Sequence, residues 1–305
     1  MLAARGAMEQ VRRSQGARVP LDTVRDILVP GADGQLPARV YDPARRDDLP
    51  LLVYVHGGGW TLGSVQAADG PCCRLAETAK CRVVSVEYRL APESPFPAAV
   101  EDCAAAIGAI LDDPSIVDRP SSMVVTMGDS AGGNLVPATA LQRRDDGSTQ
   151  PHSLMLVYPC MTSPHENRLA SMRENADAPM LSATTMAWYW DTYLDGRASD
   201  ARVDLRQAAS FSGLPRTLVV AADLNPLRNE ALLVAENMER AEVDTAVSLY
   251  PGAVHGFWLL DGILEQTVEL DHEIADFIAS AAAPAPEQIA LDISRDVPPL
   301  GQPER

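Results

Sequence analysis

The sequence predicts an α/β fold with a mostly parallel sheet and helices on both faces. Apolar runs of strand length alternate with helix-like segments along most of the 305 residues. One such run, 124–127, ends in a serine bracketed by glycines and leads at once into a helical segment. A chain of this length fits one α/β domain with insertions better than two independent domains.

The first elements form a hairpin. Segments 23–29 and 36–41 alternate apolar and polar residues around the turn cluster 30–34, which is typical of an antiparallel pair at a sheet edge. The run 51–55 is apolar throughout, as expected for a strand covered on both faces. Further strands are expected at 83–88, 123–127, 154–158, 217–222 and 246–250, and helices at 66–78, 98–111, 135–144 and 228–241.

The predicted domain boundaries follow changes in composition. Residues 1–45 are expected to hold a short helix at 2–15 and the edge hairpin, and 46–283 the main α/β domain. Residues 160–212 lack strand patterns, so this insertion is expected to build part of a cap over the carboxyl edge of the sheet. Its aromatic stripe at 184–193 fits a core helix equally well. The Ala- and Pro-rich segment 284–305 is expected to be disordered.

Charge and cysteine content restrict the partners. The net charge of −17 disfavours nucleic-acid and anionic-membrane partners, which require basic patches. The five cysteines show no metal-ligand spacing with histidine, and their odd number favours a reducing compartment. Neither a signal peptide nor a run of about 18 apolar residues is present in the sequence, which indicates the cytoplasm.

Ser130 is the candidate nucleophile. It lies in the motif Gly128-Asp129-Ser130-Ala131-Gly132, where a sharp turn between strand and helix would lift its hydroxyl to the carboxyl edge of the sheet. A serine is a poor nucleophile at neutral pH unless a base removes its proton. The alternative is a glycine-rich turn whose serine only caps the helix.

His255 is the candidate base. It follows the last predicted strand in a loop, and therefore lies at the same edge of the sheet as Ser130. The other histidines fit this role less well: His152 precedes a strand, His165 lies in the insertion, His272 falls in a helix, and His56 belongs to a glycine loop.

The glycine loop at 57–59 predicts an oxyanion hole. Three residues without Cβ let backbone N–H groups approach a ligand closely. The expected donors are the N–H groups of Gly58, Gly59 and Ala131. A phosphate-binding loop is the competing interpretation, but no Gly-Lys-Ser/Thr follows and no Gly-x-Gly-x-x-Gly with a downstream acid occurs.

Together these motifs resemble the hormone-sensitive lipase family of α/β-hydrolase esterases, in its bacterial branch. The matching segments are His56-Gly57-Gly58-Gly59-Trp60, Tyr88-Arg89-Leu90-Ala91-Pro92-Glu93, Gly128-Asp129-Ser130-Ala131-Gly132-Gly133-Asn134 and His255-Gly256-Phe257. The resemblance implies an eight-stranded sheet, a helical cap, no metal or organic cofactor, and hydrolysis of carboxylic esters with small or medium acyl groups.

One catalytic position departs from the family pattern. The family has aspartate in Asp-Pro-Leu-Arg-Asp-Glu, whereas this chain has Asn225-Pro226-Leu227-Arg228-Asn229-Glu230. Three interpretations follow. Asn225 accepts the Nδ1 proton of His255 through its oxygen, or Asp223 takes the role from two residues earlier, or the site no longer hydrolyses esters.

Two functions therefore remain open at this point. The first is a serine carboxylesterase with a Ser130, His255, Asn225 triad, acting on a small-molecule substrate. The second is a protein of the same fold recruited to acyl transfer, cyclisation, elimination or ligand binding alone. In either case Trp60, Trp188 and Trp190 are expected to line the substrate pocket. The sequence leaves a homodimer open.

Overall fold

The computed structural model of the chain describes residues 5, 19–165 and 169–282. The predicted helix at 2–15, apart from Arg5, and the predicted disorder of 284–305 fall outside the described residues.

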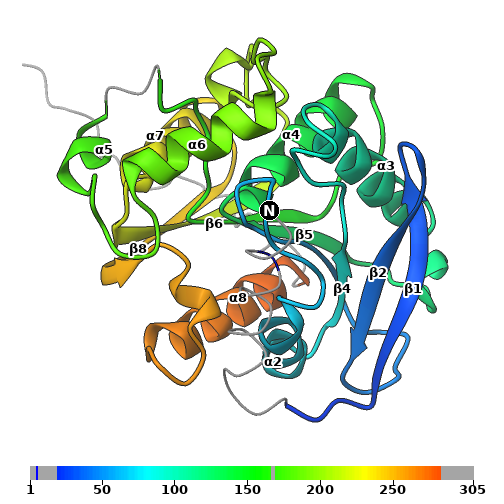
Figure 1. Cartoon of the computed structure of the whole chain (residues 1–305). Helices are drawn as coiled ribbons and strands as arrows, with labels where there is room; N and C mark the ends of the chain where they lie inside the picture. The colour runs from blue at the N-terminus through cyan, green and yellow to red at the C-terminus, as the bar shows by residue number, and fades with distance from the viewer. Residues whose placement is uncertain (1–4, 6–18, 166–168, 283–305) are drawn as a thin grey trace, which may run out of the picture.

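The described residues form one eight-stranded sheet, as the family resemblance implied (Figure 1). Its strand order is β1-β2-β4-β3-β5-β6-β7-β8. The first two strands pair antiparallel, β2 pairs antiparallel with β4, and all other pairs are parallel. The strands are β1 (Thr23–Gly31), β2 (Gly34–Asp42), β3 (Leu51–Val55), β4 (Arg82–Val86), β5 (Val124–Asp129), β6 (Ser153–Val157), β7 (Arg216–Leu224) and β8 (Thr245–Val254).

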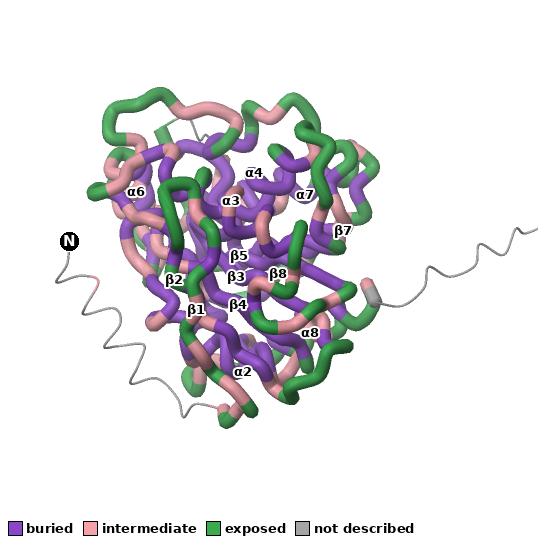
Figure 2. The backbone as a smooth tube through the Cα atoms, turned by 90° about the vertical axis from the view of Figure 1, so that its right-hand side faces the viewer, coloured by how far each residue is buried: buried purple, intermediate pink, exposed green. Residues whose placement is uncertain are grey.

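Helices cover both faces of the sheet (Figure 1). On one face lie α2 (Asp69–Ala79) and α8 (Gln266–Ala282), and on the other α3 (Ala98–Asp112), α4 (Gly132–Asp145) and α7 (Arg228–Arg240). Successive residues of a strand point to opposite faces, so β3 sends Val53 into one apolar core and Tyr54 into the other. Figure 2 shows the central strands buried between these two layers.

The segment between β6 and β7 holds the predicted insertion. Among its described residues it contains helices and turns but no strand, with α5 (Ala170–Glu174), α6 (Ala183–Leu194) and a 3₁₀ turn η2 (Leu205–Gln207). Ser182 caps the amino end of helix α6: its hydroxyl oxygen accepts the N–H of Thr185 and so satisfies a donor of the first turn.

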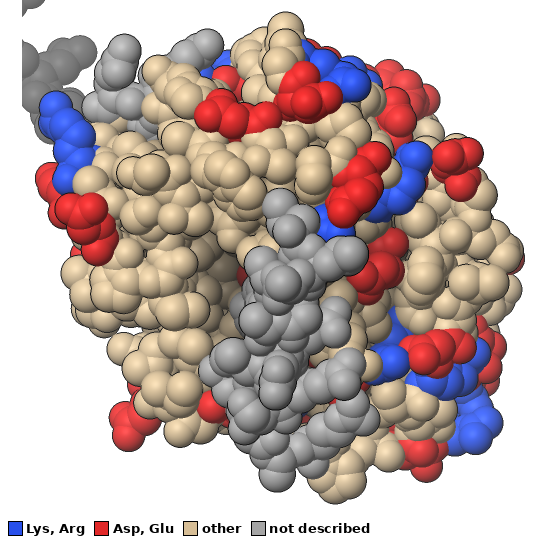
Figure 3. All heavy atoms as spheres, in the orientation of Figure 1, with Lys and Arg blue, Asp and Glu red and all other residues tan. Residues whose placement is uncertain are grey.

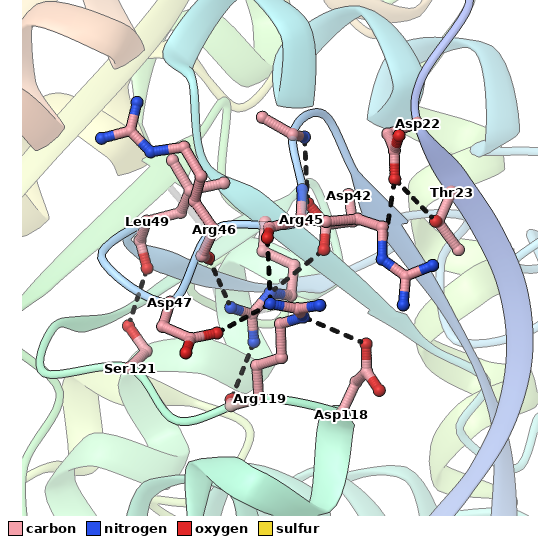
Figure 4. A network of polar contacts seen from close by, with 12 residues as sticks. Asp22, Thr23, Asp42, Arg45, Arg46, Asp47, Leu49, Asp118, Arg119 and Ser121 are labelled. Atoms are coloured by element: carbon pink, nitrogen blue, oxygen red, sulfur yellow. Dashed lines mark hydrogen bonds and ion pairs between the residues drawn. The ribbon is translucent and has the colours of Figure 1, made fainter.

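The amino ends of the parallel strands carry a buried ionic network. Arg82, fully buried at the start of β4, donates to the carbonyl oxygen of Arg119 at 2.8 Å and lies 3.9 Å from the carboxylate of Asp42. Burial lowers the pKa of Arg82, and the carboxylate of Asp42 opposes this shift. Arg119 in turn pairs with Asp47 at 2.8 Å (Figure 4). These contacts give this edge of the sheet a structural role, and the candidate site lies at the opposite, carboxyl edge.

Positive charges on the face seen in Figure 3 lie next to negative ones. Ion pairs among the described residues include Arg39 with Asp69 at 2.8 Å and Arg144 with Asp145 at 2.6 Å. The described part of this face therefore lacks the continuous positive surface that nucleic-acid phosphates require.

Candidate active site

Ser130 lies at the apex of a strained turn between β5 and α4. Its φ is +53°, in the left-handed region that non-glycine residues rarely adopt. The flanking glycines make this turn sterically feasible: a Cβ at Gly128 would lie 2.2 Å from the carbonyl oxygen of Gly132, and a Cβ at Gly132 would lie 2.0 Å from that of Val55. The turn presents the hydroxyl at the carboxyl edge of the sheet, as predicted.

His255 contacts Ser130 from the loop that follows the last strand. It follows β8 directly, and its Nε2 lies 2.9 Å from the Oγ of Ser130. Both residues are buried: 9 % of the surface of His255 and 7 % of that of Ser130 are exposed. The sequence therefore identified two residues, 125 positions apart, that form a hydrogen bond.

Asn225 lies beside His255 at the adjoining strand end. Leu224 of β7 and Val254 of β8 are register partners in a parallel pair, and each is followed by one of these two residues. Neighbouring parallel strands lie about 4.8 Å apart, so Asn225 and His255 are adjacent. The Asn225 side chain is fully buried, and its Oδ1 accepts the backbone N–H of Leu227 at 3.1 Å.

The carboxylate of Asp223, the alternative third catalytic residue, binds groups other than His255. One oxygen accepts from Nη1 of Arg228 and the other from the backbone N–H of Gly252, each at 3.1 Å. A third of its side chain is exposed. A register irregularity in β7 falls between Ala222 and Leu224, which interrupts the alternation on which the sequence interpretation of Asp223 depended.

The insertion fixes the loop that carries Asn225. The hydroxyl of Ser171 in α5 donates to the carbonyl oxygen of Pro226 at 2.7 Å and accepts the N–H of Asn229 at 3.0 Å. Asn175, just after α5, donates its amide to the carbonyl oxygen of Asn225 at 3.2 Å. These contacts leave the Asn225 backbone little freedom.

The glycine loop after β3 lies over the same site. Gly58 and Gly59 have φ values of +117° and +59°, which a residue with a Cβ rarely adopts. The buried carboxylate of Asp129 holds the loop, because its Oδ1 accepts both the N–H of Gly57 at 2.7 Å and the hydroxyl of Tyr54 at 2.6 Å. Burial raises the pKa of Tyr54 far above its usual value, with Asp129 adding to the shift, so this hydroxyl stays a donor.

A pocket of about 110 Å³ opens onto Ser130 and His255. Gly58 and Gly59 form one wall, and the apolar lining comes from Ala67, Ala68, Leu181, Met186, Tyr189 and Leu259. The ring of Tyr189 packs directly on the oxyanion loop, since a Cβ at Gly59 would lie 2.2 Å from it. Ala131, the third predicted donor, is the first residue after Ser130 and precedes α4.

The prediction that three tryptophans line this pocket is wrong. Trp60 is fully buried, stacked on Tyr193 with ring centroids 4.6 Å apart and edge-on to Trp190 at 5.1 Å. Trp188 points outward and is 45 % exposed. Helix α6 turns Met186 and Tyr189, which the sequence interpretation missed, toward the pocket. Periodicity indicated an aromatic face but not the direction in which it points.

No group of three or more His, Cys, Asp or Glu side chains among the described residues could hold a metal ion. No helix within the described ranges is long and apolar enough to cross a membrane.

The chain matches a family model described as the alpha/beta hydrolase fold over residues 52–259. It is similar to the carboxylesterase NlhH of Mycobacterium tuberculosis, with 37 % identity over 235 residues that cover 74 % of this chain and 73 % of that protein. It is also similar to an arylesterase of Saccharolobus solfataricus, with 33 % identity over 242 residues covering 78 % of each chain.

Solved structures show the same likeness. A hyperthermophilic esterase from the archaeon Pyrobaculum calidifontis superimposes with a TM-score of 0.84 and 35 % identity, covering 92 % of this chain and 93 % of that one. A thermostable carboxylesterase cloned from a metagenomic library gives a TM-score of 0.85 and 33 % identity, covering 93 % and 98 %.

Proposed function

Because the chain belongs to the α/β-hydrolase family, in its hormone-sensitive lipase branch, we propose that it hydrolyses carboxylic esters through an acyl-enzyme on Ser130. The observation that carries the proposal is the 2.9 Å contact between Nε2 of His255 and Oγ of Ser130, made at a strained turn. The relatives described above are all named as esterases. No observation favours a non-hydrolytic reaction.

The reaction follows from the positions of the groups. The ester carbonyl oxygen is placed toward the N–H groups of Gly58, Gly59 and Ala131, where negative charge develops. Ser130 Oγ attacks the carbonyl carbon while its proton moves to Nε2 of His255. The imidazolium then gives that proton to the leaving alcohol, which forms the acyl-enzyme. Water, activated by the same histidine, hydrolyses this intermediate and releases the acid.

Pocket size supports short acyl groups. A dry cavity of about 150 Å³ in another protein binds benzene, so the 110 Å³ here suits an acyl chain of about four carbons or fewer. The lining by Leu181, Met186 and Leu259 favours an alkyl chain over a charged one.

The rate of ester hydrolysis should depend on pH through His255. Only a neutral imidazole accepts the serine proton, so kcat/KM for p-nitrophenyl acetate should rise from pH 5 to 8, the range in which histidine ordinarily loses its proton. The initial rates of purified protein, corrected for spontaneous hydrolysis, measure this. A flat profile across that range would remove His255 from the mechanism.

The proposal includes a homodimer formed through β8. This strand is the edge of the sheet, and Val247 and Leu249 on it are 42 % and 46 % exposed. An apolar edge strand pairs readily with a second copy of itself. Light scattering should give twice the mass of the chain, and Leu249→Lys should shift the protein to the monomer. A monomeric parent protein would contradict this part of the proposal.

We also propose the cytoplasm as the location. All five cysteines are buried and free of disulfides, which fits a reducing compartment. The net charge of −17 supports the expectation that nucleic acids are not partners.

A further inference from the structure

A buried ionic cluster contacts the loop that carries His255. The carboxylate of Asp271 in α8 accepts the indole N–H of Trp258 with one oxygen, at 2.7 Å, and Nε of Arg74 in α2 with the other. Trp258 and Asp271 are fully buried, and Arg74 is 8 % exposed. The cluster therefore connects α2 and α8, which pack against each other, to a residue three positions after His255 (Figure 1).

Further contacts fix the backbone of the same loop. Nη2 of Arg74 donates to the carbonyl oxygen of Trp258 at 3.1 Å, and the hydroxyl of Thr267 in α8 donates to that of Phe257 at 2.9 Å. The loop consists of a single 3₁₀ turn, η3 (Phe257–Leu259). Because so short a turn has few hydrogen bonds of its own, the contacts from α2 and α8 determine where the loop and its histidine lie.

The site requires a carboxylate at position 271. Nε1 of Trp258 and Nε of Arg74 are donors and cannot accept, so each needs an oxygen. Burial raises the pKa of Asp271, and the charge of Arg74 opposes this shift. An asparagine of the same shape has one oxygen and would place its amino group against one of the two donors.

The indole of Trp258 also contacts the part of the site that holds the oxyanion loop. Its ring lies edge-on to that of Tyr54, with the ring centroids 5.5 Å apart. The Tyr54 hydroxyl binds the carboxylate of Asp129, which accepts the N–H of Gly57. One side chain therefore contacts both the histidine loop and the tyrosine that binds the oxyanion-loop anchor.

We propose that Asp271 is a positioning residue, which holds Trp258 and thereby sets the position of His255 against Ser130. The inference rests on the proposed function, because it assigns catalysis to those last two residues. Proton transfer from the serine requires Nε2 within hydrogen-bond distance of Oγ, and the two atoms lie 2.9 Å apart. A displacement of about 1 Å lowers the rate of such a step by about 10²-fold.

Asp271→Asn tests the inference in the full-length protein. The loop should shift, so kcat for p-nitrophenyl acetate should fall by about 10- to 100-fold while KM changes by less than about threefold. Trp258→Phe keeps an aromatic ring but removes the indole N–H, and it should lower kcat by a smaller factor. In the double variant the asparagine oxygen serves Arg74 alone, so kcat should be no lower than in Asp271→Asn.

Asp42→Asn is the matched control. Asp42 is a buried aspartate that faces the buried Arg82, but at the amino edge of the sheet. Both exchanges neutralise a buried carboxylate beside an arginine, so both should lower the thermal midpoint. In assays well below both midpoints, kcat of Asp42→Asn should stay within about twofold of the parent. Equal losses of kcat in the two variants would overturn the inference, because the rate would then follow stability and not the position of His255.

Hydrogen exchange measured by mass spectrometry reports on the loop independently of activity. The N–H groups of Leu259 and Leu260 form hydrogen bonds within the 3₁₀ turn. Peptides that cover 255–262 should exchange at least about tenfold faster in Asp271→Asn than in the parent or in Asp42→Asn. Unchanged exchange there would overturn the inference, and so would faster exchange with unchanged kcat.

Treatment of the same samples with an activated phosphonate separates this inference from the proposed function. An adduct on Ser130 of the parent, combined with unchanged exchange in Asp271→Asn, would leave the esterase intact and reject the role of Asp271. Absence of the adduct and of hydrolysis in the parent would reject the esterase, and with it the catalytic role assigned to Asp271, whatever the exchange rates are.

Discussion

Ser130→Ala is expected to remove measurable hydrolysis of short p-nitrophenyl esters. Without the hydroxyl no acyl-enzyme can form, and loss of the serine in a comparable hydrolase lowers kcat by about 10⁶-fold. A neutral residue at position 225 is expected to slow the parent enzyme already. We therefore expect a loss of about 10²- to 10⁴-fold in the parent background and about 10⁶-fold in the Asn225→Asp background.

The folded state should tolerate this change. The φ of +53° at position 130 is as unfavourable for serine as for alanine, and the side chain Oγ contacts His255 in a site that alanine fits. Equal circular dichroism and thermal midpoints for the two proteins provide the control. Unchanged turnover in a folded Ser130→Ala protein would show that another group is the nucleophile.

Asn225→Asp is expected to raise kcat/KM by about 10²- to 10⁴-fold, which corresponds to roughly 2.7–5.4 kcal/mol of transition-state stabilisation. The carboxylate accepts Nδ1–H of His255, which leaves Nε2 without hydrogen toward Ser130. It also stabilises the imidazolium that forms as Ser130 attacks. Michaelis–Menten kinetics on p-nitrophenyl acetate measure the gain, which should appear mainly in kcat because the pocket lining is unchanged.

Two matched variants complete the comparison. Asn229→Asp adds the same charge four residues later, in the first turn of α7, and should change kcat/KM by less than about twofold. Asp223→Asn removes the charge that pairs with Arg228 and leaves one acceptor oxygen in place of the two that bind Arg228 and Gly252, and it should reduce the rate by less than about tenfold. If Asp223→Asn instead abolished activity and Asn225→Asp had no effect, Asp223 would be the third catalytic residue.

Much of the fold could be predicted from the sequence. The apolar runs and the serine turn identified the strands, and a parallel sheet brings its carboxyl ends to one edge. For that reason the position of His255 after β8 was enough to predict that it contacts Ser130. The neutral residue at 225 was equally visible, because a motif with known spacing surrounds it.

Contacts that depend on how a helix is rotated about its axis, or on backbone groups, could not be predicted from the sequence. Which face of α6 meets the pocket depends on how the insertion docks, so Tyr189 was missed and Trp188 was assigned to the wrong side. The β7 irregularity redirects Asp223, and no residue pattern marks it. The N–H of Leu227 is a backbone group that every non-proline residue has, so its control of the Asn225 amide appears only in three dimensions.

The most direct test of the account is mass spectrometry after treatment with an activated phosphonate, which bonds only to a competent serine nucleophile. The account predicts one adduct per chain, mapped to the peptide that contains Ser130. It should form slowly in the parent protein, at least about tenfold faster in Asn225→Asp, and not at all in Ser130→Ala. An adduct that persists in Ser130→Ala, or a parent protein and Asn225→Asp variant that both stay unlabelled at Ser130, would contradict the account.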